Sequence, residues 1–169
     1  MEQAALAADA GCTYIAPYVN ELKVHFDSAY TDNDKGFDVA RLAQQYYDRI
    51  NATTQVLPAS LTSIAEVMQL AGAHHITVSP PLLTELARTP AGTWSTTNEP
   101  TGLWFSSTDG AGVGSHSDRE MRELCKDEAS WRMAFTRSKK GENERKLGQA
   151  INIFADMQDK LEEMARHAM

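Results

Sequence analysis

The stretch that decides the fold is Cys12-Thr-Tyr-Ile-Ala-Pro-Tyr-Val19, a short apolar run rich in β-forming residues. A run of this length is typical of a buried strand. The Ala-rich segment Gln3–Ala10 before it is expected to form a helix that ends at Gly11. Pro17 interrupts the backbone ladder near the end of the run, and polar residues follow at once. The sequence therefore predicts a strand whose carboxyl end meets polar side chains.

The same alternation of helix and strand continues to residue 88. The expected elements after the first strand are a helix over Phe37–Asn51, a strand over Thr53–Ala59, a helix over Ser60–Ala71, a strand over His75–Ser79 and a helix over Leu82–Ala87. Strands that alternate with helices pair in parallel through right-handed crossovers. The fold class is therefore α/β, with three parallel strands and flanking helices.

The remainder of the chain has a different composition. Thr89–His116 is mostly Gly, Ser, Thr and Pro, which is typical of a long loop or linker. Helices are expected over Asp118–Lys126 and Glu128–Phe135, and one long amphipathic helix over Glu142–Met169. The chain is therefore divided into an α/β part at 1–88, a linker at 89–117 and C-terminal helices at 118–169.

Composition and charge exclude several classes of protein. The 169 residues fit one domain, and the net charge of −7 makes nucleic acid and anionic membranes unlikely partners. No apolar run approaches the ~18 residues of a membrane-spanning helix, and no basic region precedes the apolar N-terminus as in a secretory signal. Cys12 and Cys125 lack metal-ligand spacing, so a reduced chain in the cytoplasm is expected.

Two further patterns predict no cofactor. His74 and His75 are adjacent on an expected strand, so they point to opposite faces and cannot chelate one metal from the same face. Gly110-Ala-Gly-Val-Gly114 follows no expected strand, which a dinucleotide or phosphate loop requires. We therefore expect neither a metal nor an organic cofactor.

Several segments together resemble the transaldolase family. They are Glu2–Val19, Thr54–Ser60, Leu70–Leu83, Asp127–Phe135 and Ala150–Ala155. The resemblance implies a (β/α)8 TIM barrel that transfers a three-carbon ketol unit between sugar phosphates through a lysine Schiff base, in carbohydrate metabolism and the pentose phosphate pathway. It covers strands six to eight and the C-terminal helices, so a partial TIM barrel is expected.

The lysines do not match what the resemblance implies. The family's Schiff-base lysine lies on an earlier strand, and none of this chain's lysines falls in an expected strand. A Schiff-base lysine needs a pKa lowered by burial or by a nearby cation. Lys23 alone follows a strand end closely, and its polar neighbours predict a solvated side chain.

The residues that align with the family also differ from its pattern. Ala16 replaces a serine, Tyr18 a phenylalanine, Glu21 an arginine and Thr62 a phosphate-binding arginine, whereas Ser60 matches the family's serine. Arginine binds phosphate through paired hydrogen bonds, and a carboxylate would repel it. The strand ends are therefore not expected to favour sugar phosphates.

The candidate site has one catalytic and four binding residues. Tyr18 is the catalytic candidate, because its hydroxyl can donate or accept a proton; Asn20, Glu21, Ser60 and Thr62 are the candidates for substrate binding. Two alternatives are open: Tyr18 fills the barrel interior with its hydroxyl bonded to backbone, and Ser60 and Thr62 cap a helix.

Three functions are compatible with these residues. The first is a transaldolase-like protein that is not active as a transaldolase on its own. The second is a diverged enzyme of specialised metabolism that acts on a non-phosphorylated carbonyl or sugar-like compound through Tyr18, and the third is a non-catalytic binding or scaffold fragment. Unpaired sheet edges predict a homo-oligomer or a covering partner, or C-terminal helices and a linker that fold over the exposed sheet face.

Overall fold

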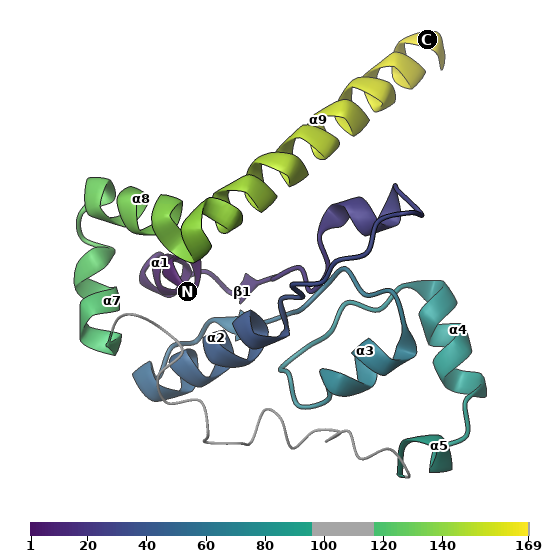
Figure 1. Cartoon of the computed structure of the whole chain (residues 1–169), viewed down its shortest axis with the longest axis horizontal. Helices are drawn as coiled ribbons and strands as arrows, with labels where there is room; N and C mark the ends of the chain where they lie inside the picture. Colours follow the sequence, from purple (N-terminus) through teal and green to yellow (C-terminus); the bar gives the residue numbers. More distant parts are fainter. Residues whose placement is uncertain (96–116, 169) are drawn as a thin grey trace.

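The computed structural model describes residues 1–95 and 117–168, and Figure 1 shows a body of short elements from which one long helix projects. The elements are α1 (Glu2–Asp9), β1 (Tyr14–Ile15), η1 (Leu22–His25), α2 (Phe37–Ile50), β2 (Gln55–Val56), α3 (Ile64–Gln69), α4 (Pro80–Arg88), α5 (Gly92–Ser95), α7 (Asp118–Leu124), α8 (Glu128–Arg137), η2 (Ser138–Gly141) and α9 (Glu142–Ala168). Most of the expected linker at 89–117, including Gly110–Gly114, lies outside the described residues.

The helices expected from periodicity and caps are confirmed, with one boundary moved. The helix over Phe37–Ile50 ends at Asn51, which adopts the left-handed conformation of a C-cap. The helix expected from Ser60 begins instead at Ile64. Its N-cap is Ser63, whose side chain accepts a hydrogen bond from the Glu66 amide. The capping interpretation of Ser60 and Thr62 is therefore wrong.

Within residues 1–95 and 117–168, the sheet has two parallel strands. Tyr14 pairs with Gln55 and Ile15 with Val56. Hydrogen bonds continue past the assigned strands as far as the backbone amide of Asn20, which donates to the carbonyl of Ser60 at 3.3 Å. The α/β class is therefore confirmed, and the carboxyl ends of the two strands lie together. A partial barrel is consistent with this sheet.

The third expected strand, His75–Ser79, is not a strand in the structure. Its backbone still runs along β2: the amides of His75 and Thr77 donate to the carbonyls of Val56 and Pro58 at 3.2 and 2.9 Å. The return hydrogen bonds are missing, because the amide of Val56 donates to His74 Nδ1 at 3.1 Å and Pro58 has no amide hydrogen. On this side of β2, the segment therefore donates backbone hydrogen bonds to β2 but accepts none from Val56 or Pro58.

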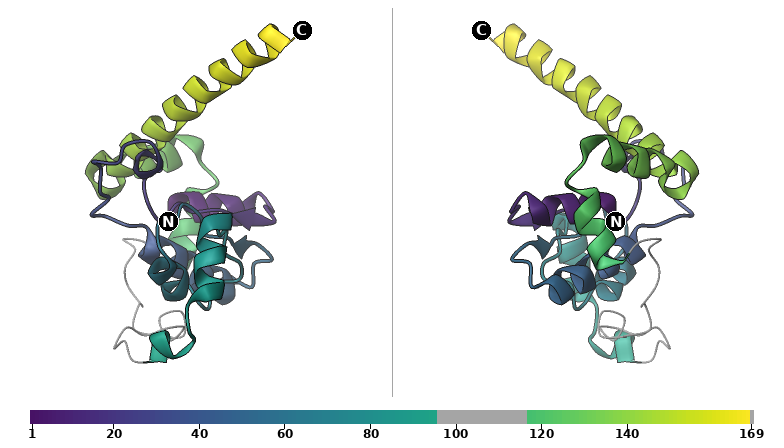
Figure 2. Two further views of the ribbon diagram at one scale, coloured as in Figure 1. Left: turned by 90° about the vertical axis from the view of Figure 1, so that its right-hand side faces the viewer. Right: turned by 90° about the vertical axis from the view of Figure 1, so that its left-hand side faces the viewer.

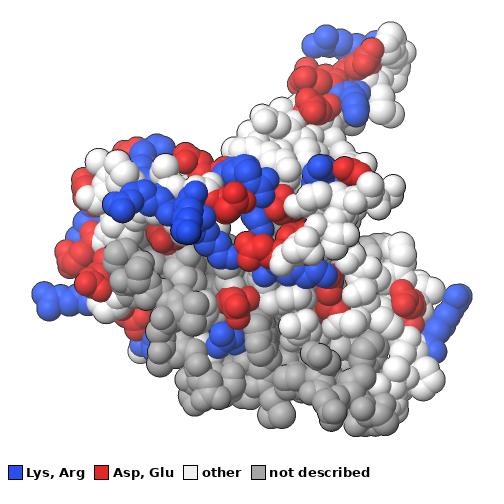
Figure 3. Space-filling view, in the orientation of Figure 1, with Lys and Arg blue, Asp and Glu red and all other residues white. Residues whose placement is uncertain are grey.

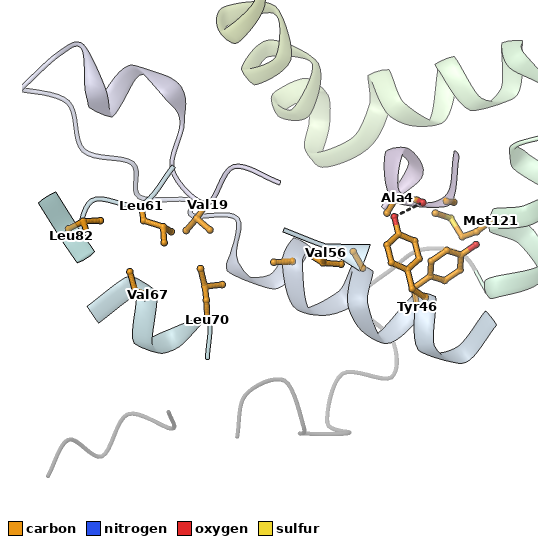
Figure 4. Close-up of a cluster of buried hydrophobic side chains, with 13 residues drawn as sticks. Ala4, Val19, Tyr46, Val56, Leu61, Val67, Leu70, Leu82 and Met121 are labelled. Atoms are coloured by element: carbon orange, nitrogen blue, oxygen red, sulfur yellow. Dashed lines mark hydrogen bonds between the residues drawn. The ribbon is translucent and has the colours of Figure 1, made fainter. Parts of the chain in front are cut away.

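One apolar core connects these elements. Figure 4 shows Val56 between a group of side chains around Val67 and Leu70 and another around Tyr46 and Met121. The hydroxyl of Tyr47 donates to the carbonyl of Ala4 at 2.9 Å, which fixes α1 on α2. Burial raises the pKa of Tyr47, so this hydroxyl stays protonated as a donor.

The last helix, α9, leaves the body at a break in the backbone. Lys139, Lys140 and Gly141 all have positive φ, and α9 then extends away from the rest of the described chain (Figures 1 and 2). No residue of α9 is buried. Tyr14 and Tyr18 on the open sheet face remain 47% and 42% exposed. The expectation that the C-terminal helices fold over this face is therefore wrong for α9.

Candidate functional site

The polar side chains at the strand ends form two groups. Asn20 and Thr62 contact the buried carboxylate of Glu66, and Asn20 also holds the backbone carbonyl of Ser60. Glu21 turns toward α9. Asn20 and Glu21 are adjacent in the sequence, so the extended backbone sends their side chains in different directions. The structure thus brings together three of the four predicted binding residues.

Asn20 is almost completely buried and positions the end of the second strand. Its side-chain amide donates to the carbonyl of Ser60 at 2.8 Å and to Glu66 Oε2 at 3.0 Å, and its backbone amide also donates to the Ser60 carbonyl, at 3.3 Å. These bonds use both hydrogens of the Asn20 carboxamide. Its side chain therefore has no amide hydrogen left for a substrate.

Glu66 is the central acceptor of this first group. It forms an ion pair with Lys35 at 2.5 Å, and its Oε2 accepts the backbone amide of Thr62 at 2.7 Å. Burial raises the pKa of the Glu66 carboxyl, but the hydrogen bonds from Lys35, Thr62 and Asn20 outweigh burial and hold it below its usual value. Glu66 is therefore an ionised carboxylate that positions its neighbours.

Ser60 has an unusual backbone and an unusual partner. It lies between β2 and α3 with φ of +64°, a left-handed conformation that is uncommon outside glycine and asparagine. Its hydroxyl Oγ is 2.8 Å from Nε2 of His25, which is exposed at the end of η1. Ser60 thus combines a left-handed backbone with a histidine at hydrogen-bonding distance.

Glu21 and its neighbours form ion pairs with the N-terminal end of α9. The buried Glu21 carboxylate pairs with Arg145 at 2.9 Å and with Lys146 at 3.5 Å. Lys146 also lies 3.5 Å from Asp34, and Lys139 pairs with the same carboxylate at 2.8 Å. Figure 3 shows acidic and basic side chains interleaved where α9 meets the body. The charge that Glu21 brings to the strand ends is therefore compensated by α9.

The pKa values in this second group follow from the ion pairs. The hydrogen bond from Lys139 is the main reason that the pKa of Asp34 is lowered. The hydrogen bond to Glu21 is the main reason that the pKa of Arg145 is raised. Burial, and then a hydrogen bond to Glu21, raise the pKa of Tyr30. These shifts favour the charged forms of Asp34 and Arg145 and the neutral form of Tyr30.

Tyr18 lies on the open face of the sheet. Its backbone bridges to Ala59, and Gly36 packs against it so closely that a Cβ at Gly36 would lie 2.7 Å from the Tyr18 carbonyl oxygen. Tyr18 is 42% exposed, so its side chain is accessible from solvent.

The sequence did not point to several residues of these groups. Lys35, Glu66, His25 and Arg145 were not among the candidates. The signal for Glu66 was available, because Ser63-Ile-Ala-Glu66 has the spacing of a capping box. The other three become neighbours only through tertiary contacts, so no local pattern identifies them.

The described part of the chain has no lysine in a strand and no cluster of metal-binding side chains. All seven lysines lie in it, none in a strand; Lys23 pairs with Asp27 at 3.3 Å and lies 4.6 Å over the ring of Tyr30. The described residues contain no group of three or more His, Cys, Asp and Glu side chains that could hold a metal ion. They also contain no helix long and apolar enough to cross a membrane.

Comparison with known proteins identifies the family. The family model described as Transaldolase/Fructose-6-phosphate aldolase matches residues 1–165, nearly the whole chain. The chain belongs to this family. The resemblance seen in the sequence segments is thereby confirmed.

Curated relatives named transaldolase align with this chain at low identity. The protein of Alteromonas mediterranea is 30% identical over 99% of this chain and 49% of its own length. The protein of Trichormus variabilis is 35% identical over 53% of this chain and 29% of its own length. The protein of Gibberella intermedia is 28% identical over 90% of this chain and 45% of its own length. The chain thus spans at most about half the length of these relatives.

Proposed function

We propose that this member of the transaldolase family binds a small, uncharged carbonyl or sugar-like compound at its strand ends, and that its 169 residues do not perform ketol transfer through a Schiff base. The site residues are Tyr18 for proton transfer and the hydroxyl groups of Ser60 and Thr62 for binding. Glu21 and Asn20 act by positioning. The proposed location is the cytoplasm, which rests on the unpaired cysteines.

The observation that carries this proposal is the ion pair between Lys35 and Glu66. Lys35 is the lysine tied to the strand-end cluster, and its ammonium group is bound to a carboxylate whose pKa is lowered. A Schiff base requires a neutral amine that can attack a carbonyl carbon. An ammonium group held in this way positions Glu66 and its hydrogen-bond partners and does not act as the nucleophile.

The charges at the strand ends support an uncharged substrate. Thr62 stands where the family has a phosphate-binding arginine, and its amide and hydroxyl both contact Glu66. Arg145 and Lys146 lie nearby, but they pair with Glu21 and Asp34. Phosphate binding here would require these ion pairs to break, which disfavours a sugar phosphate.

Borohydride trapping tests the proposal. The chain is incubated with dihydroxyacetone or with fructose 6-phosphate, reduced, and weighed by intact mass spectrometry, with Lys35→Arg and Lys23→Arg as matched variants. We expect no adduct above that of a denatured control. A single adduct that maps to Lys35 and disappears in Lys35→Arg would contradict the proposal.

The surface of α9 favours a second candidate, the scaffold role, in the form of association between copies of this chain. Its apolar stripe is exposed and has helical spacing; it consists of Leu147, Ile151, Phe154, Met157, Leu161 and Met164. Such a stripe on a helix without buried residues is typical of a helix-pairing surface. Light scattering tests this: we expect a dimer or larger species that dissociates in Leu161→Glu, and a monomeric wild type would contradict it.

A further inference from the structure

Ser60 and His25 form a contact between a hydroxyl and an imidazole nitrogen, which the proposed carbonyl binding does not explain. A serine hydroxyl and an imidazole nitrogen at 2.8 Å are at the distance found between a nucleophile and its base. The nitrogen involved is Nε2, the imidazole atom that points outward from the backbone. Neither residue takes part in the ion pairs of Glu66 and Glu21, and His25 is exposed to solvent.

The backbone around Ser60 holds this pair in place. Ser60 lies in the irregular segment between the end of β2 at Val56 and the start of α3 at Ile64, and its backbone is left-handed. A non-glycine residue keeps such a conformation only where the surrounding contacts hold it. Two hydrogen bonds from Asn20 to the Ser60 carbonyl fix this segment.

We propose that Ser60 is a nucleophile activated by His25 and that it accepts acyl groups from small uncharged esters. This reaction differs from the carbonyl binding proposed above, although both use the Ser60 hydroxyl, and it differs from the lysine chemistry of the family. The ester must be small or extended because Ser60 is partly buried, and uncharged because the nearby cations and carboxylates are already paired.

The reaction proceeds in two balanced steps. Ser60 Oγ forms a bond to the carbonyl carbon of the ester while its proton moves to His25 Nε2; the bond to the leaving alcohol then breaks, and the alcohol oxygen takes that proton. A water molecule next attacks the acyl group, gives a proton to Nε2, and releases a carboxylic acid while Ser60 Oγ regains the proton. No oxidant, metal or further reactant is needed.

Both steps pass through a tetrahedral oxyanion, and both amide hydrogens of Asn20 are already bound to Ser60 and Glu66, so this side chain is not free to stabilise either one. An activated ester has a much better leaving group than the acyl-serine ester that water must attack. With such an ester we therefore expect acylation to be faster than turnover. The readout is a covalent acyl group on Ser60 and not a high steady-state rate.

The test uses p-nitrophenyl acetate with the full chain. The burst of p-nitrophenolate is measured, and peptide mass mapping then locates the acetyl group. We expect one acetyl group on Ser60 in the wild type. Ser60→Gly removes the hydroxyl and tolerates the positive φ, so it is expected to lose the burst and remain folded.

Variants at His25 separate a base from a structural partner. His25→Gln can still hydrogen-bond to Ser60 Oγ but cannot accept its proton, and we expect acylation of Ser60 to slow by about 100-fold, the lower range for a general base. Added imidazole is expected to restore acylation of Ser60 in His25→Ala. Ser28→Ala and His167→Ala are the matched exposed controls and are expected to behave like the wild type.

Two results would overturn the proposal. The first is an acetyl group spread over several serines and lysines with no preference for Ser60. The second is acylation of Ser60 at the wild-type rate in a folded His25→Gln variant. Circular dichroism of each variant shows whether it is folded, so loss of the burst through unfolding is distinguished from loss of the base.

Discussion

The body, which comprises the elements from α1 to α8, and the arm formed by α9 are stabilised by different forces. In the body, Leu70, Val56 and Tyr47 are almost completely buried and pack into one core. In α9 no residue is buried, and the helix is attached to the body through ion pairs of Arg145 and Lys146. Apolar burial depends little on ionic strength, whereas partly exposed ion pairs are screened by salt. The two regions should therefore respond to different changes.

Leu70→Ala is expected to have the largest effect on stability. Leu70 is fully buried, so the substitution leaves a cavity and should lower the free energy of unfolding by about 2–5 kcal/mol. In the monomeric chain, Leu161→Ala makes the same chemical change on the exposed arm and should change the free energy of unfolding by less than about 0.5 kcal/mol. Urea unfolding followed by circular dichroism measures both. Similar effects for the two variants would show that α9 shares the core.

Glu66→Gln is expected to be the second largest change. It removes the charge from a buried acceptor that three groups contact, and the partly exposed Lys35 reduces the loss through solvent screening. The expected loss is about 1–3 kcal/mol, the range for buried hydrogen bonds to a charged group. Asp38→Asn, which changes an exposed carboxylate in an ion pair with Arg41, is the control and should cost much less.

The pH dependence of stability provides a separate test of Glu66. Its pKa is lower in the folded chain than in the unfolded chain, so the carboxylate stabilises the fold above its unfolded pKa. That contribution is lost as the pH falls through the lowered folded pKa. The stability difference between wild type and Glu66→Gln should therefore shrink toward acid pH. A difference that stays constant between neutral and acid pH would contradict the assignment of Glu66 as ionised.

Glu21→Gln is expected to affect the arm more than the core. The variant removes the carboxylate that Arg145 and Lys146 share, so the angle between α9 and the body should vary more widely. Arg145 is half exposed, so the expected cost in global stability is below about 1 kcal/mol. Spin labels at residues 48 and 164 would measure the distance distribution. Glu142→Gln removes only the other, exposed partner of Arg145 and is the matched control. An unchanged distribution in Glu21→Gln would mean that other contacts hold the arm.

The sequence predicted local elements better than the contacts between them. The helix over Phe37–Ile50 and the long C-terminal helix follow from periodicity, which is a property of neighbouring residues. The start of α3 was misplaced because Ser60 and Ser63 are both plausible caps, and the spacing to Glu66 decides between them. Residues far apart in the sequence form the ion pair between Glu21 and Arg145, which local patterning does not reveal.

The same difference between local patterns and tertiary contacts explains which residues of the candidate site could be predicted. Tyr18 and Ser60 were placed correctly at the strand ends, because parallel strands bring their carboxyl ends together. Their partners depend on loops: His25 reaches Ser60 from η1, and Lys35 reaches Glu66 from the segment before α2. Loop conformation follows from tertiary packing, so these partners could not be predicted from spacing.

Pro58→Ala is expected to have the most local effect, on a single hydrogen bond, and tests the missing third strand. The substitution supplies an amide hydrogen where β2 faces the His75–Ser79 segment, so a hydrogen bond of about 0.5–1.5 kcal/mol can form. Loss of the proline makes the unfolded chain more flexible, which costs about 0.4–1 kcal/mol, and Pro58 is almost completely buried, so the substitution also removes packed methylene groups and a net loss of stability is expected. Hydrogen exchange measured by NMR is therefore the better readout. A slowly exchanging amide at position 58, with stronger protection at His75 and Thr77, would show that the segment is a strand which lacks one donor. Fast exchange at position 58 would instead show that the geometry of the segment, and not the proline, prevents the third strand from forming.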